Sequence, residues 1–213
     1  MFLKNYVFDF DGTLVDTFRD VLDSLKCAFE KCHVAVSAFD TGTIMQFQLT
    51  DVIRTLVPHI TPAQSEQVAG RFREIYDSMD YPNTVLMPTV GELLPMLKAR
   101  SSEMFIVSNK RAVPTLRILD KFNIRHFFSG IFNPDMFKGG RAMTKPELLA
   151  YAIKEHSLAK NSTVYIGDSG GDVTAAKENG VVAIAVQNGY GYIPSFKIKP
   201  DYTFRQIIEI LTV

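Results

Sequence analysis

Acidic side chains follow two short apolar runs of this sequence. Asp9 and Asp11 follow the first run, near the N-terminus, and Asp168 and Asp172 follow a later one. Carboxylates that crowd into one site repel each other, so such a group requires a cation. Carboxylate oxygens suit Mg²⁺ better than zinc. If the two runs end side by side, these acids predict a magnesium site.

A hydroxyl and a lysine extend this chemistry towards phosphate. Ser108 follows another apolar run, and Lys145 stands before Pro146 at the expected start of a helix. Both groups could hold phosphate oxygens as charge shifts in a transition state. Of the first two acids, one could attack phosphorus while the other protonates the leaving group. The residue types therefore favour phosphoryl transfer through an aspartyl-phosphate.

Apolar runs alternate with stretches of helical spacing in most of the chain. We expect strands near 6–8, 104–107, 127–132, 164–166 and 181–186, and helices near 90–97, 114–122, 148–153, 171–179 and 207–211. Continuously apolar strands that alternate with helices predict an α/β fold with a doubly wound parallel sheet, Rossmann-like and covered on both faces. Ligands of such sheets bind beyond the carboxyl ends of the strands.

One part of the chain has a different character. Residues 16–81 show only helical spacing, in stretches near 21–29, 49–57 and 62–79. We therefore predict a core domain of residues 1–15 and 82–213 and a small helical cap domain of residues 16–81, inserted after the first strand. The turn-forming residues 80–84 are the expected return linker.

Composition narrows the class of protein. The chain has 213 residues and is 46% hydrophobic, enough for one packed domain with an insert. Its formal net charge of zero argues against nucleic acid or an anionic membrane as a partner. No apolar stretch approaches the ~20 residues of a membrane helix. The two cysteines, Cys27 and Cys32, suit free thiols in a reducing cytoplasm. Oligomeric state is not predictable from these features.

Four segments carry a resemblance to a known family. They are DFDGTLVD at 9–16, SNK at 108–110, KP at 145–146 and GDSGGD at 167–172. In this order they resemble the four motifs of the haloacid dehalogenase superfamily, and most closely its phosphoglycolate-phosphatase-like branch. The resemblance covers nearly the whole chain. It implies a magnesium-dependent phosphatase for a small phosphate monoester.

The resemblance also implies roles for the acids. Asp9 would be the nucleophile, and Asp11 the general acid and base. Magnesium would be bound by Asp9, by the backbone carbonyl of Asp11 and by Asp168. Asp172 would support the metal site, directly or through water.

The remaining motif residues would bind the phosphoryl group; they are Ser108, Asn109 and Lys145. The helical insert would be a mobile cap that gates access to the site. The sequence departs from the branch at two places. TIMQFQ stands at 43–48, where a loop glycine is usual, and Pro88-Thr89 replaces the usual proline-glycine of the return linker.

Other functions use similar residues. A phosphomutase of the same superfamily could pass the phosphate to a sugar, although Thr13 after Gly12 favours hydrolysis. A phospho-acceptor domain of the response-regulator type would be shorter and would lack the insert. A non-catalytic binding module would not need the acids at 9, 11 and 168. GDSGG also resembles the serine site of chymotrypsin-like proteases, but those require an all-β chain with disulfides, which this sequence does not predict. A P-loop requires GK[ST] after a glycine loop, and the sequence has none.

Overall fold

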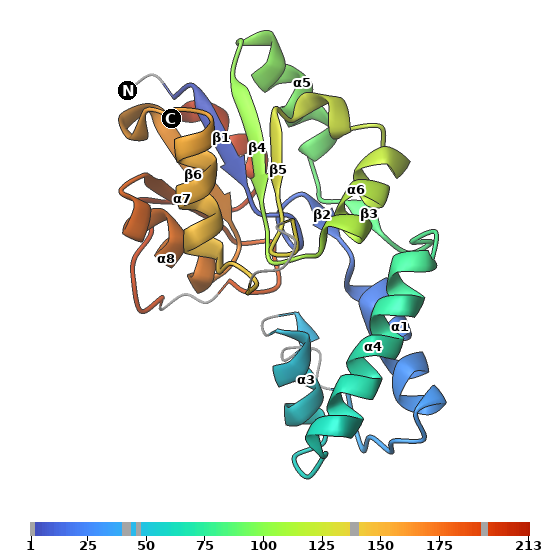
Figure 1. Cartoon of the computed structure of the whole chain (residues 1–213). Helices are drawn as coiled ribbons and strands as arrows, with labels where there is room; N and C mark the ends of the chain where they lie inside the picture. Colours follow the sequence, from blue (N-terminus) through green and yellow to red (C-terminus); the bar gives the residue numbers. More distant parts are fainter. Residues whose placement is uncertain (1–2, 40–43, 46–47, 137–140, 193–195) are drawn as a thin grey trace. The chain divides into compact units, whose positions relative to one another are not determined.

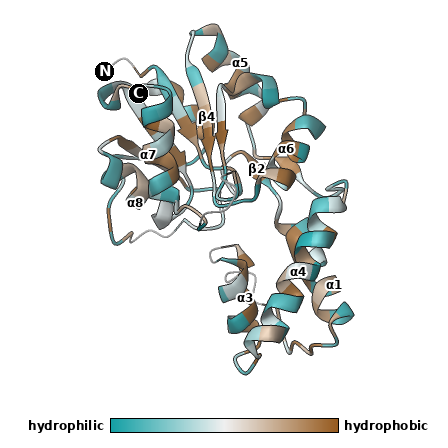
Figure 2. Cartoon of the chain, in the orientation of Figure 1, coloured by the Kyte–Doolittle hydropathy of each residue, from teal (hydrophilic) through white to brown (hydrophobic). Residues whose placement is uncertain are grey.

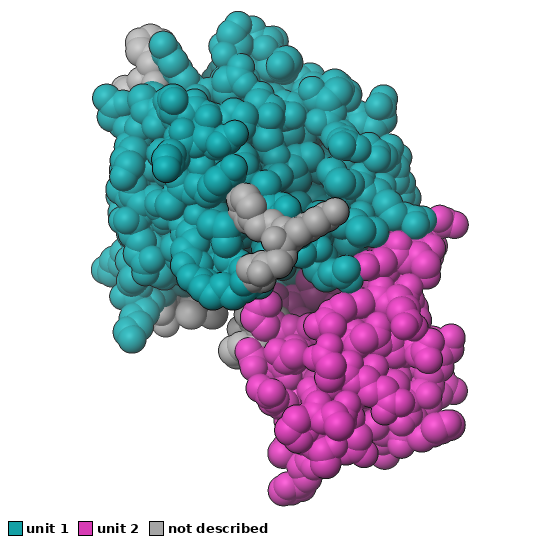
Figure 3. All heavy atoms as spheres, in the orientation of Figure 1, with its two compact units in different colours: residues 1–16, 86–213 teal, residues 17–85 magenta. Residues whose placement is uncertain are grey.

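The computed structural model describes residues 3–39, 44–45, 48–136, 141–192 and 196–213. The chain divides into two compact units, of which the first comprises residues 1–16 and 86–213 and the second residues 17–85 (Figure 3). Residues 43, 46 and 47 of the TIMQFQ departure lie outside the described residues. Among the described residues, every helix is too short or too polar to span a lipid bilayer.

The first unit is built on a six-stranded parallel sheet with the strand order β5-β4-β1-β6-β7-β8 (Figure 1). Its strands are β1 (Asn5–Phe8), β4 (Glu103–Val107), β5 (Gly130–Phe132), β6 (Thr163–Gly167), β7 (Val182–Val186) and β8 (Tyr202–Phe204). Because β1 lies between β4 and β6, three segments distant in sequence become neighbours. The predicted fold class is confirmed.

Helices cover the sheet on both faces. They are α5 (Val90–Ala99), α6 (Ala112–Lys121), α7 (Lys145–Glu155) and α8 (Gly170–Asn179), with 3-10 turns at Arg125–Phe127, Lys160–Ser162 and Ile207–Thr212. Side chains of α7 and α8 pack over one face, against Val7, Phe105 and Tyr165. The neighbours Phe8 and Ile106 point to the other face and are also fully buried. Figure 2 shows the hydrophobic residues concentrated along strands such as β4.

Several elements differ from the sequence prediction. β8 was not predicted, because its Tyr202 and Thr203 are exposed and give no apolar run. The predicted short closing helix is present, and it is of the 3-10 type. Two short strands were also missed, β2 (Val15–Asp16) and β3 (Val85–Leu86), which pair with each other. Asp16 is therefore a strand residue, although 16–81 was predicted to be purely helical.

The second unit contains α1 (Phe18–Lys31), α3 (Leu49–Leu56) and α4 (Pro62–Ser78). Its core includes Leu25, Phe29, Ile53 and Val68. The buried carboxylate of Asp20, in α1, accepts hydrogen bonds from the backbone and side-chain amides of Asn83 and from the hydroxyl of Thr84. These bonds join the end of the unit to its first helix.

Thr89 is one of the two departures from the family pattern, and the structure shows what it costs. It is the residue before α5, and its φ of +67° lies in the left-handed region that glycine adopts at low cost. Its buried hydroxyl finds no hydrogen-bond partner among the described residues. A glycine at this position, as in the proline-glycine pattern, would avoid both penalties.

Thr89→Gly is therefore expected to raise the free energy of unfolding by about 1 kcal/mol, because it relieves the left-handed backbone. Urea denaturation measures the change. Thr89→Ala is the matched control, since it removes the hydroxyl but keeps Cβ. A glycine variant no more stable than the alanine variant would contradict the backbone explanation.

Candidate active site

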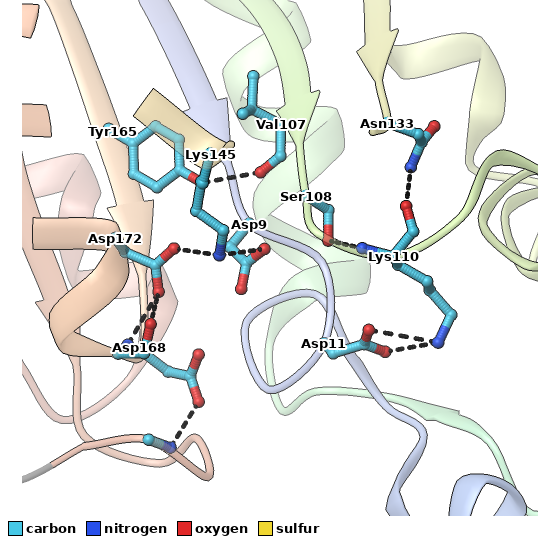
Figure 4. Close-up of polar contacts among 12 residues, drawn as sticks. Asp9, Asp11, Val107, Ser108, Lys110, Asn133, Lys145, Tyr165, Asp168 and Asp172 are labelled. Atoms are coloured by element: carbon cyan, nitrogen blue, oxygen red, sulfur yellow. Dashed lines mark hydrogen bonds and ion pairs between the residues drawn. The ribbon is translucent and has the colours of Figure 1, made fainter. Parts of the chain in front are cut away.

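Three of the predicted site residues follow three adjacent strands. Asp9 follows β1, Ser108 follows β4 and Asp168 follows β6. Phe8, the last residue of β1, is in register with the fourth residue of each neighbouring strand. The strands therefore end at the same edge of the sheet, and the side chains that follow them gather there (Figure 4).

A cluster of carboxylates forms at this edge. Asp9, Asp168 and Asp172 each offer an oxygen atom, and these atoms lie within 4.8 Å of one another. All three side chains are buried. Buried carboxylates at this spacing form an all-oxygen donor set of the kind that Mg²⁺ takes, so the residues present fit the implied metal.

Lys145 is the cation within this cluster. Its Nζ lies 3.0 Å from Oδ1 of Asp9 and 2.6 Å from Oδ1 of Asp172. The lysine is buried at the first position of α7, and a capping box between Thr144 and Glu147 defines where that helix begins. The helix start therefore positions the ammonium group between two carboxylates.

Asp172 is held from two sides. Its Oδ1 accepts from Lys145, and its Oδ2 accepts from the backbone N–H of Ser169 at 2.9 Å and the Ser169 hydroxyl at 2.6 Å. A Cβ added at Gly167 would lie 2.2 Å from Cγ of Asp172, so only glycine allows this approach. Both carboxylate oxygens have protein partners, so Asp172 fixes Lys145 and Ser169 in place.

Burial and mutual repulsion shift the protonation of the cluster. Burial, with added repulsion from Asp172 and Asp168, raises the pKa of Asp9 to about 8, although Lys145 opposes the shift. Burial and Asp172 raise the pKa of Asp168 to about 6. Burial by itself would lower the pKa of Lys145, but the carboxylates of Asp172 and Asp9 outweigh it and raise that pKa. One ammonium group does not offset this much negative charge, and a divalent cation would.

The side chain of Asp11 contacts a different cation. Its two carboxylate oxygens lie 3.0 and 3.2 Å from Nζ of Lys110 (Figure 4). The backbone carbonyl of Lys110 accepts from the side-chain amide of Asn133 at 2.7 Å. The side chain of Asp11 thus pairs with Lys110, whereas the carboxylate cluster pairs with Lys145. Lys110 was included in the SNK motif in the sequence analysis but was given no role there. A carboxylate whose side chain does not bind the metal needs a nearby cation, and this need was the signal that could have identified Lys110.

The predicted phosphate-binding residues lie in different settings. The Ser108 hydroxyl is buried and accepts from the backbone N–H of Lys110 at 3.2 Å. Asn109, the next residue, is exposed. Lys145 lies inside the carboxylate cluster. Of the three, Ser108 and Lys145 are at the buried strand edge.

Another contact that sequence reasoning missed comes from the loop after β7. The backbone N–H of Gly191 donates to Oδ2 of Asp168 at 2.9 Å. The N–H groups of Gly191 and Tyr190, together with Lys145, partly oppose the rise in the pKa of Asp168. The glycine-rich run at 189–191 was the available signal, because glycines permit a close approach of two backbones.

Fold and site together define an α/β protein with buried acids, a lysine and a hydroxyl at the carboxyl edge of three central strands. The family model described as haloacid dehalogenase-like hydrolase matches residues 6–186. The chain belongs to this family, which confirms the resemblance seen in the motifs.

Similar proteins cover almost the whole chain. The phosphoglycolate phosphatase of Pasteurella multocida is 28% identical, with 97% of this chain and 96% of that protein covered. The phosphoglycolate phosphatase of Vibrio cholerae is 26% identical, with 99% and 96% covered. A solved structure of a haloacid dehalogenase-like family hydrolase from Streptococcus pneumoniae has a TM-score of 0.86 at 25% identity, covering 99% of this chain and 97% of that one.

The shifted acids predict a pH effect on stability in metal-free buffer. The folded Asp9, up to about pH 8, and the folded Asp168, up to about pH 6, retain protons that ordinary unfolded carboxyl groups lose near pH 4. The native state therefore binds more protons than the unfolded state, and stability falls as the pH rises through this window. Urea denaturation in EDTA measures the fall.

Asp9→Asn is expected to reduce this fall, because it removes the group with the largest shift. Asp23→Asn, at an exposed aspartate paired with Arg19, is the matched control and is expected to behave like the wild type. If the wild type and Asp9→Asn lose the same amount of stability over this pH range, the raised pKa of Asp9 is not the cause of the fall.

Proposed function

We propose that this chain is a magnesium-dependent phosphatase that hydrolyses a small phosphate monoester through an aspartyl-phosphate on Asp9. The observation that supports this most is the setting of Asp9 itself. It is a buried carboxylate at the end of the central strand, 3.0 Å from the ammonium group of Lys145 and beside two further acids. Such a site attracts a cation, which would in turn attract a phosphate, and it excludes bulk water.

In the proposed reaction, an oxygen of Asp9 attacks phosphorus and the ester P–O bond breaks. Lys145 and Ser108 bind phosphoryl oxygens and stabilise the charge of the transition state. Asp11 gives its proton to the departing alkoxide. Mg²⁺, when bound by Asp9, Asp168 and the backbone carbonyl of Asp11, would supply charge neutralisation.

The second half of the reaction restores the protein. Asp11, now a carboxylate, takes a proton from water, and the water oxygen attacks phosphorus. The bond between phosphorus and Asp9 breaks, and inorganic phosphate leaves. Asp11 ends each turnover protonated, ready for the next ester.

For the substrate we propose a phosphoglycolate-like ester. Support comes from the relatives named phosphoglycolate phosphatase, which match over nearly their whole length. We further propose that residues 16–81 act as a cap that encloses a small ester, and that the protein works in the cytoplasm. Both Cys27 and Cys32 are free thiols, which supports a reducing compartment.

Phosphate release from a panel of small phosphate esters tests the class of reaction. We expect release by the wild type with Mg²⁺ and none in EDTA. Asp9→Asn should lower kcat/KM at least about a thousandfold, because it removes the nucleophile. Asp23→Asn, the exposed control, should retain wild-type activity. Substantial turnover by Asp9→Asn would rule out the proposed mechanism.

The covalent step is tested with Asp11→Asn and an aryl phosphate, whose leaving group needs no proton. Asparagine cannot activate water, so we expect phosphoryl-Asp9 to accumulate. Mass spectrometry of peptides from acid-quenched protein should show one added phosphoryl group on the peptide that contains Asp9. A phosphorylated enzyme that discharges onto a sugar phosphate rather than water would favour the phosphomutase instead.

A further inference from the structure

The loop that follows β7, at residues 189–191, lies directly on Asp168. The N–H of Gly191 donates to Oδ2 of Asp168 at 2.9 Å. A Cβ added at Gly189 would lie 2.1 Å from Cβ of Asp168, and one added at Gly191 would lie 2.7 Å from Cβ of Ser169. Real Cβ atoms do not make such contacts, so the loop reaches this position only because both residues are glycine.

Tyr190, between these two glycines, joins the loop to a third segment. A Cβ added at Gly12 would lie 2.9 Å from Cδ2 of Tyr190, so the tyrosine ring lies against the turn that follows Asp11. The Tyr190 hydroxyl donates a hydrogen bond to Oδ1 of Asp16, in β2. One side chain thus contacts both ends of the segment from Gly12 to Asp16.

Gly12 meets Asp168 as well. It has a φ of +79°, and a Cβ at this position would lie 2.4 Å from Oδ2 of Asp168. Three segments therefore meet around a single carboxylate: the turn at Gly12, the end of β6 and the loop at 189–191. Tyr190 contributes the side chain that ties the last of these to the first.

We propose that Tyr190 is a positioning residue for the metal site. Its ring and hydroxyl hold the loop in place, and the loop in turn holds Oδ2 of Asp168 and keeps this carboxylate beside Asp9 and Asp172. The proposal rests on the proposed function, because it assumes that this cluster binds Mg²⁺. Hydrogen-bond partners that orient metal ligands commonly change metal affinity by about 10- to 100-fold when they are lost.

Calorimetric titration with Mg²⁺, without substrate, tests this role directly. Tyr190→Phe keeps the ring and loses the bond to Asp16, and we expect a several-fold weaker Kd. Tyr190→Ala also removes the ring from Gly12, and we expect Kd to rise by about 10- to 100-fold. Gly189→Ala should weaken binding at least as much, because its Cβ would displace Asp168.

Matched controls separate this effect from general damage. Tyr202→Phe makes the same chemical change at an exposed tyrosine, and Gly70→Ala adds a Cβ that meets nothing within 4 Å. Both should keep the wild-type Kd. Circular dichroism establishes that each variant is folded, and Tyr190→Phe, the mildest change, remains informative if Tyr190→Ala or Gly189→Ala does not fold.

The outcomes distinguish this proposal from the proposed function. Wild-type protein that binds no Mg²⁺ would overturn the metal site and the role of Tyr190 together. Wild-type protein that binds Mg²⁺ while the folded Tyr190 variants bind it equally well would overturn only the role of Tyr190. Weaker binding in the Tyr190 variants, with unchanged Kd in both controls, is the result that supports the proposal.

Discussion

The structure of this site depends on one electrostatic constraint: three buried carboxylates lie together, and one ammonium group contacts two of them. Lys145 contacts Asp9 and Asp172, and Asp168 lies within reach of both acids. Burial penalises each charge, and one lysine offsets only part of the repulsion. The raised pKa values of Asp9 and Asp168 are the consequence. A site with this imbalance favours a bound cation, and the same imbalance attracts no anion until the cation is present.

Backbone features on every side keep the charged groups in this arrangement. The first turns of α7 and α8 supply Lys145 and Asp172, and a capping box defines the start of each helix. Gly167 lets α8 approach the end of β6, and the turn at Gly12 approaches Asp168. The helix starts and the glycines therefore bring backbone segments close enough for short polar contacts, which side-chain packing alone does not achieve.

The proposed chemistry divides between two charge clusters. The proposed nucleophile Asp9 shares its lysine with Asp172, whereas the proposed proton donor Asp11 has its own partner in Lys110. Only Phe10 separates the two acids in sequence, yet their side chains contact different cations from different segments. This separation suits their proposed roles, because the nucleophile needs a neutralising environment and the proton donor needs to exchange protons with the leaving group and water.

The sequence by itself was sufficient for the fold class, for five of the six strands of the main sheet, and for the family. Apolar runs identify buried strands, and motifs at the strand ends are readable without coordinates. The roles of Asp9, Ser108 and Lys145 stay predictions, although the structure places these residues at one strand edge. Only the tertiary structure decided that Asp11 faces Lys110 and that the loop of Tyr190 lies on Asp168. Those contacts join segments far apart in the chain, and the order of strands in the sheet, which no local pattern encodes, determines which segments meet.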